Sequence, residues 1–201
     1  MIPMYNRRKM WYLLASVGVI LVAWLILTLY AERKGPPKEW SIGGARNDHK
    51  ALIIFDPDPF YNLDEKVCIS FANALTENNF LVTVMTVAAA EQSSDTTYDL
   101  YVYCANTYNW RPDRAIVGYI KSRNELHNNK PVVAITLGAG STGASQKHLE
   151  KIITASGAPI YSSYSLWLWR PNDETTPEKT NVTVAVAMAY EWGMGIGRQL
   201  K

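Results

Sequence analysis

Residues that commonly carry out chemistry are scarce in this chain of 201 residues. Its two cysteines, Cys68 and Cys104, are too few for a disulfide scaffold and have no metal-ligand spacing, so we expect both to be small buried residues. The three histidines lie far apart, and no G-x-S-x-G nucleophile motif occurs. The 20 basic and 18 acidic residues nearly balance, without the basic stripe that binds nucleic acid. We therefore predict no catalytic or metal-ligating residue and no nucleic-acid partner.

One long hydrophobic run interrupts this ordinary composition. Residues 11–30 carry no charge, and at about 1.5 Å per residue they span about 30 Å, the thickness of a bilayer's hydrocarbon core. Trp11, Tyr12 and Tyr30 lie at its ends, where aromatic rings favour the membrane interface. The alternatives are a buried core helix and a cleaved signal peptide, although the residues after the run make a poor cleavage site. We expect a transmembrane helix that anchors the chain in the cell membrane in a single pass.

The rest of the chain divides into segments of different composition. Arg7, Arg8 and Lys9 precede the hydrophobic run and other basic residues follow it, so the positive charges leave the orientation in the membrane undecided. Beyond the run the chain is close to neutral, with 17 basic and 18 acidic residues. The predicted organisation is a basic tail at residues 1–10, a transmembrane helix at 11–30, a linker rich in glycine and proline at 31–50, and one folded domain at 51–201.

The domain alternates between strand-like and helix-like patterns. Short apolar runs predict buried strands at residues 51–55, 80–87, 98–105, 131–137 and 159–169. Asn62 and Glu65 form a capping box that starts the first helix, Pro112 starts the second, and further helices are expected at 146–156 and 176–200. The last segment also alternates as a strand would, but its length favours a helix. The alternation predicts an α/β fold, a doubly wound five-stranded parallel sheet that binds ligands beyond the carboxyl ends of its strands.

The loop after the third predicted strand carries the most informative residues. Thr107, Tyr108, Asn109 and Trp110 follow the strand directly, and aromatic rings at the end of a sheet can stack on a flat ligand. Here the chain resembles the flavodoxin-like family, whose sheet order is 2-1-3-4-5 and whose matching loop flanks the ring of FMN. The resemblance implies that Tyr108 and Trp110 contact the ring, that Asn106 to Asn109 supply backbone hydrogen bonds, and that the loop after the fourth strand contributes Gly138, Ala139 and Gly140.

The loop after the first predicted strand departs from that family. Where the family has serine, threonine and glycine around the FMN phosphate, this chain has Asp56 and Asp58, which repel a phosphate, and two prolines, which donate no hydrogen bond. Tyr61, Asn62 and the first amides of the helix remain as donors. Two alternatives stay open: the aspartates cap turns and FMN does not bind, or their carboxylates hold a cation such as Mg²⁺.

A glycine-rich loop follows the fourth predicted strand. Gly138, Gly140 and Gly143 have the G-x-G-x-x-G spacing between a strand and a helix, which favours an anion at the start of the helix. A nicotinamide-binding site would need an acidic residue about 20 positions further on, and residues 160–168 contain none. A loop that binds an anion and a plain tight turn both remain open.

Two functions fit these features. One is a membrane-anchored flavodoxin-like protein that binds FMN for electron transfer, with a redox or protein partner. The other is a cofactor-free flavodoxin-like domain that serves as an interaction or scaffold module, because a fold alone does not fix a function. If the protein is an enzyme, it is an FMN-dependent electron-transfer protein or oxidoreductase. A bound flavin favours a cytoplasmic domain.

Overall fold

The computed structural model describes residues 4–44, 48–93, 97–123, 129–176 and 178–200. The chain forms two compact units, Met1–Arg33 and Lys34–Lys201. The first unit is the helix α1, Met4–Ala31. Within it, Lys9–Ala31 has a mean hydropathy of 2.4 and is long and apolar enough to cross a membrane. A signal sequence near an N-terminus meets the same criteria, so length and composition make α1 a candidate span only.

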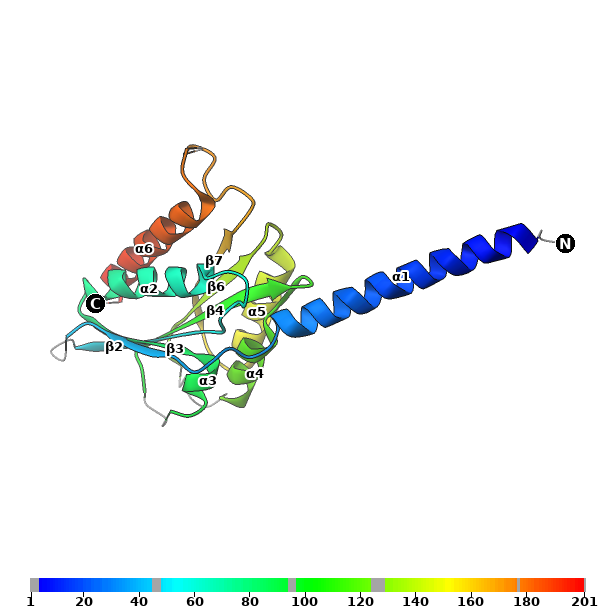
Figure 1. Ribbon diagram of the computed structural model, residues 1–201. Helices are drawn as coiled ribbons and strands as arrows, with labels where there is room; N and C mark the ends of the chain where they lie inside the picture. Colours follow the sequence, from blue (N-terminus) through cyan, green and yellow to red (C-terminus); the bar gives the residue numbers. More distant parts are fainter. Residues whose placement is uncertain (1–3, 45–47, 94–96, 124–128, 177, 201) are drawn as a thin grey trace. The chain divides into compact units, whose positions relative to one another are not determined.

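The second unit is built on a mostly parallel sheet (Figure 1). Its strands lie in the order β1 (Glu39–Ile42), β3 (Phe80–Thr86), β2 (His49–Phe55), β4 (Leu100–Tyr108), β6 (Val132–Gly138) and β7 (Ile160–Trp167), and the short β5 (Arg111–Pro112) pairs with β4 alone. All strands from β3 to β7 on this path pair in parallel. Numbered along the chain, the five parallel strands have the order 2-1-3-4-5, and the predicted fold class is confirmed.

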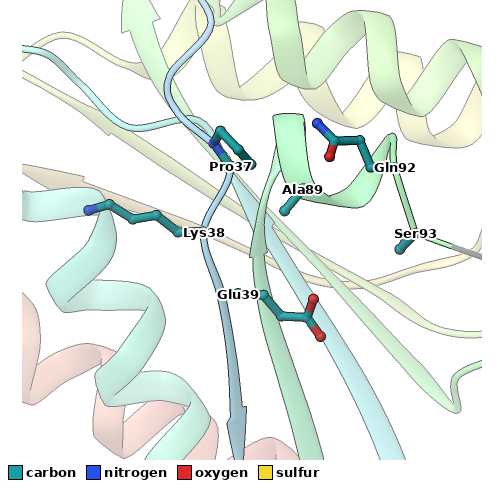
Figure 2. Close-up of a pocket in the computed structure, with 6 residues that line it drawn as sticks. All are labelled: Pro37, Lys38, Glu39, Ala89, Gln92 and Ser93. Atoms are coloured by element: carbon teal, nitrogen blue, oxygen red, sulfur yellow. The ribbon is translucent and has the colours of Figure 1, made fainter.

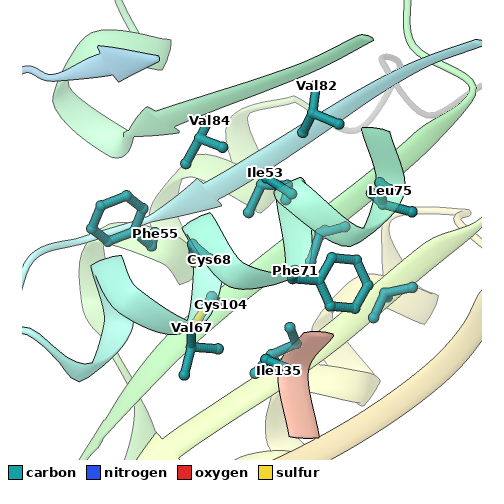
Figure 3. Packing of buried hydrophobic residues seen from close by; sticks show 14 of the residues in the cluster. Ile53, Phe55, Val67, Cys68, Phe71, Leu75, Val82, Val84, Cys104 and Ile135 are labelled. Carbon is teal, nitrogen blue, oxygen red and sulfur yellow. The ribbon is translucent and has the colours of Figure 1, made fainter. Parts of the chain in front are cut away.

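Helices cover both faces of the sheet (Figure 1). On one face lie α2 (Leu63–Thr76) and α6 (Asn181–Gln199), and on the other lie α3 (Val87–Ala90), α4 (Arg114–Ser122) and α5 (Gly143–Ala155). Figure 3 shows how α2 directs Phe71 and Leu75 onto Ile53 of the sheet. Both cysteines are buried and free in this core, as the sequence predicts.

The two helices on the first face pack unusually closely. A Cβ atom at Gly193 of α6 would lie 2.7 Å from the backbone oxygen of Phe71 and 2.8 Å from the Cβ of Ala74, both on α2. Only a residue without a side chain permits this approach. The final segment forms a helix, as predicted, although this helix begins at Asn181 rather than at residue 176.

The predicted linker differs most from the structure, because residues 34–42 belong to the folded unit. Strand β1 pairs antiparallel with β3, and Trp40 lies opposite Val84. The ring of Trp40 stacks on Phe55, with 6.0 Å between their centroids. Without β1, the hydrogen-bonding groups of β3 would be exposed at the edge of the sheet. The parallel sheet thus gains an antiparallel edge strand that we did not expect.

Two predicted helix starts are also wrong in detail. The side chain of Asn62 makes no capping hydrogen bond, and Glu65 binds the amine of Lys38 at 2.9 Å instead of completing a capping box. Pro112 lies in β5, and α4 starts after Asp113, whose carboxylate accepts hydrogen bonds from two amides of the first turn. An aspartate at this position satisfies amides that have no partner within the helix.

Candidate functional site

Three loops meet at the carboxyl ends of the parallel strands. They follow β2, β4 and β6. The chain passes from β2 to β3, which lies on one side of β2, and then crosses to β4, which lies on the other side of β2. The strand order therefore reverses between β2 and β4. Open α/β sheets bind ligands at such a reversal. All ten sequence-predicted site residues lie on these three loops or at the strand ends beside them.

The loop after β4 is a β-hairpin rather than the open loop that we expected. Strand β4 continues beyond Ala105, and Thr107 and Tyr108 pair with Pro112 and Arg111 of β5. The two residues between them, Asn109 and Trp110, have φ angles of +48° and +60°. Positive φ at both central residues is what a type I′ turn requires, and this turn suits the twist of a two-stranded hairpin. The hairpin therefore holds Trp110 on a fixed backbone.

Trp110 is an unusual residue for this position. Glycine is favoured there, and a bulky side chain with positive φ strains the backbone. The residue is nevertheless 66% exposed, so its side chain gains little from burial. Strain of this kind is concentrated at functional sites. A tryptophan that neither the turn nor the core requires marks the hairpin as a candidate binding surface.

The carboxylate of Asp58 joins the hairpin to the loop after β2. Its Oδ1 accepts hydrogen bonds from the amides of Phe60 (2.7 Å) and Tyr61 (3.0 Å). Its Oδ2 accepts a hydrogen bond of 2.5 Å from the hydroxyl of Tyr108. Burial and the nearby Asp58 raise the pKa of Tyr108 well above its usual value, so the hydroxyl stays protonated and donates. One carboxylate thus fixes both loops.

A second carboxylate, that of Asp64, is linked to the first because it accepts a hydrogen bond from the backbone amide of Asp58. It is buried at the start of α2 and accepts hydrogen bonds from the amides of Asp58 (2.6 Å) and Glu65 (2.7 Å) and from the side-chain amide of Asn106 (2.9 Å). Burial raises the pKa of Asp64 to about 6, against the lowering effect of these hydrogen bonds. Asn106 also donates to the backbone oxygen of Asp56 at 3.1 Å, so it bridges the ends of β2 and β4.

Asp56 links the N-terminal part of the folded unit to the end of β2. It is 2% exposed, and its Oδ1 accepts a hydrogen bond of 3.0 Å from the amide of Gly35. Burial raises the pKa of Asp56 to about 6, and the charge of Asp64 adds to the rise. Asp56 and Asp64 are therefore structural carboxylates whose charge is costly within the fold.

The end of β6 lies against the hairpin at Gly138. A Cβ atom at Gly138 would lie 2.8 Å from the Cγ2 of Thr142 and 3.1 Å from the Cβ of Thr107. The hydroxyl oxygen of Thr107 is buried there and has no hydrogen-bond partner among the described residues. Further along, the carbonyl of Ala139 accepts the amides of Trp169 and Arg170, so residues 138–140 are joined mainly to the chain after β7.

The predicted site residues therefore form two groups. Tyr61, Asn106 and Tyr108 come together through Asp58 and Asp64. Ala139 and Gly140 lie beside Arg170 instead, and Gly138 lies beside Thr107 of the hairpin. Asn62 precedes α2 without using its side chain as a cap. Within the described ranges, no group of three or more His, Cys, Asp or Glu side chains is placed to hold a metal ion.

Sequence reasoning missed the buried carboxylate of Asp64 and the link from Asp58 to Tyr108. The helical period contained a signal for the first, because Asp64 lies three and four positions before the buried residues Val67 and Cys68. No local signal existed for the second, because the two residues are 50 positions apart and meet only where β2 pairs with β4.

A separate pocket of about 280 Å³ opens beside β1 and α3 (Figure 2). None of its described lining residues is aromatic, so they offer no stacking surface for a planar ring. Its lining residues are Pro37, Lys38, Glu39, Ala89, Gln92 and Ser93.

The arrangement at the strand ends fits one part of FMN and not the other. The exposed ring of Trp110 suits stacking on a planar ring. The phosphate does not fit the loop after β2, because the amides of Phe60 and Tyr61 already bind Asp58. The residues present therefore fit the ring of FMN and not its phosphate.

Comparison with known proteins finds similarity in structure only. No family model matches the sequence, and no curated protein is a significant match. The folded part is similar to rubredoxin:oxygen oxidoreductase from Desulfovibrio gigas, with 17% identity, a TM-score of 0.57, and 75% of this chain and 36% of that chain covered. It is also similar to a flavodoxin from the domain Archaea, with 10% identity, a TM-score of 0.53, and 75% of this chain and 98% of that chain covered. A WrbA-like flavodoxin from Agrobacterium tumefaciens is similar too, with 10% identity, a TM-score of 0.54, and 77% of this chain and 100% of that chain covered. The match spans about a third of the oxidoreductase and nearly all of each flavodoxin.

Proposed function

Because the folded unit has a flavodoxin-like fold, we propose that it binds a flavin at the carboxyl ends of its strands and transfers electrons beside a membrane. The hairpin that carries Trp110 is the observation on which this proposal depends. It presents an exposed indole on a fixed backbone at the reversal of strand order, where such sheets bind ligands. A bound flavin supplies the electron-transfer chemistry, and the protein supplies binding and orientation.

Two residues of the hairpin have separate tasks in this proposal. Trp110 stacks on the flavin ring. The bond from Tyr108 to Asp58 holds the hairpin against the loop after β2, so the stacking surface is preorganised. Binding to a preorganised surface costs less conformational entropy.

The membrane is the second element of the proposal. We infer that α1 tethers the domain, because Lys9–Ala31 is long and apolar enough to span a bilayer. A tether confines electron exchange to partners at the membrane surface, and the flavin favours a domain on the cytoplasmic side. The partner is a redox protein or another membrane-bound electron carrier.

One observation favours a second candidate, a cofactor-free interaction module. The loop after β2 satisfies its own amides through Asp58, as a loop with no ligand would. In that case the exposed side chains of Phe60 and Trp110 form a protein contact instead of a flavin site.

Titration of riboflavin into the full chain in detergent micelles tests the proposal. We expect saturable quenching of flavin fluorescence by the wild type and at least tenfold weaker binding by Trp110→Ala, because stacking depends on the indole. Trp11→Ala is the control, since it removes an indole from the other unit and leaves the strand ends unchanged. Absence of quenching in the wild type would reject flavin binding and favour the interaction module.

A further inference from the structure

The start of α2 is where this fold would bind an anion. Amides before and within the first turn of a helix have no partner inside the helix, and they point outward together with the positive end of the helix dipole. The loop between Phe55 and Leu63 leads into this turn directly from the end of β2. A flavin with a phosphate group would place that phosphate here, according to the family resemblance.

Carboxylates of the chain itself already occupy four of these donors. Asp58 accepts the amides of Phe60 and Tyr61 with one oxygen. Asp64 accepts the amides of Asp58 and Glu65, one with each oxygen. Four amides that could bind an anion therefore have acceptors, and a carboxylate oxygen is the same kind of acceptor as a phosphate oxygen.

The charges around this loop also oppose a phosphate. Asp56, Asp58 and Asp64 all lie at the end of β2 or the start of α2. The nearby lysines are paired with other acids, Lys34 with Glu91 at 2.6 Å and Lys38 with Glu65 at 2.9 Å. A phosphate brings close to two negative charges, so it would have to displace Asp58 while adding to the repulsion.

We propose that the Asp58 carboxylate stands where the phosphate of FMN would bind, and that the site therefore selects flavins without a phosphate, of the riboflavin class. This inference rests on the proposed flavin binding and names the ligand class. Asp58 is a specificity-determining residue in this view. It excludes phosphate by occupying the amides of Phe60 and Tyr61, and it positions Tyr108 at the same time.

Paired titrations with riboflavin and FMN test the selection in the full chain. We expect the wild type to bind riboflavin at least tenfold more tightly than FMN. Asp58→Ser removes the charge and leaves the two amides with at most a weaker hydroxyl acceptor, so we expect it to reduce that ratio at least tenfold by gaining FMN affinity. Asp58→Asn keeps an oxygen acceptor for the amides while removing the charge, and we expect an intermediate ratio. Asp48→Asn, at the opposite ends of the strands, leaves the ratio unchanged.

A second measurement needs no flavin. Inorganic phosphate is added to ¹⁵N-labelled full chain, and the amide resonances of Phe60 and Tyr61 are followed by NMR. We expect no change in the wild type and saturable shifts in Asp58→Ser, with Asp48→Asn behaving as the wild type does. Unchanged resonances elsewhere in each variant show that the fold is retained.

The outcomes separate this inference from the proposed function. Wild-type chain that binds FMN as tightly as riboflavin overturns the inference and supports flavin binding. Phosphate that shifts the wild-type amides, or that leaves Asp58→Ser without a response, also overturns it. If the wild type binds no flavin while Asp58→Ser gains a phosphate response, the occupied anion position is supported and the flavin function is rejected.

Discussion

Replacing Asp56 by asparagine tests the energetic cost of a buried carboxylate at the end of β2. Asp56 is almost fully buried and accepts one hydrogen bond, from Gly35. An asparagine oxygen accepts the same bond without a charge. The variant therefore removes the charge while keeping the contact that attaches residues 34–38 to the sheet.

The expected magnitude follows from the pKa of Asp56, which burial raises from 3.8 to about 6. Below pH 3.8 the carboxyl is protonated in both the folded and the unfolded chain, so it costs nothing. Between pH 3.8 and 6 the unfolded chain loses this proton first, so the free energy of unfolding falls as pH rises. At about 1.4 kcal/mol per pH unit, the total loss is about 3 kcal/mol, and it stays constant above pH 6.

Urea unfolding of the full chain in micelles, followed by fluorescence between pH 4 and 8, measures this effect. Asp64 titrates in both proteins, so the difference between variant and wild type reports the charge of Asp56 together with its repulsion from Asp64. We expect Asp56→Asn to match the wild type near pH 4 and to exceed it by roughly 1–3 kcal/mol at pH 7.5. The reasoning is refuted if the difference in free energy of unfolding between variant and wild type does not change with pH. It is also refuted if the variant loses stability relative to the wild type between pH 4 and pH 7.5.

Three further changes have outcomes that urea unfolding can check. Gly193→Ala forces a Cβ against the backbone of Phe71 and should cost about 1–3 kcal/mol, whereas Gly195→Ala meets open space and should be neutral or slightly stabilising; equal effects would contradict the close packing. Asp113→Ala removes the cap of α4 and should cost about 1 kcal/mol, and no loss would show that the cap is dispensable. Trp110→Gly should relieve backbone strain and gain about 1 kcal/mol while riboflavin binding is lost; a loss of stability would mean that the indole supports the fold.

The parallel sheet was predictable because each strand is a short apolar run buried on both faces. Residues 51–55 and 131–137 contain almost no polar side chain, and helical patterns separate the runs. Strand β1 was not predictable in this way. Its four residues lie among glycines and prolines, and they form a strand only because β3 presents an edge to pair with.

The position of the candidate site was predictable, but its chemistry was not. Strand ends at a reversal of order indicate where ligands bind, and the sequence placed Tyr108 and Trp110 there. The hairpin was missed because Asn109 is followed by tryptophan rather than by glycine, the usual signal for a type I′ turn. The role of Asp58 depends on Tyr108, which is distant in sequence and near only in the folded sheet.

The central claim is that the site binds a flavin ring and excludes a flavin that carries a phosphate. Competitive equilibrium dialysis tests this claim most directly. The wild-type full chain in micelles is dialysed against equal concentrations of riboflavin and FMN, and the bound flavin is identified by chromatography. We predict about one flavin per chain, nearly all of it riboflavin. Bound flavin that is mainly FMN, or no bound flavin at all, would contradict the claim.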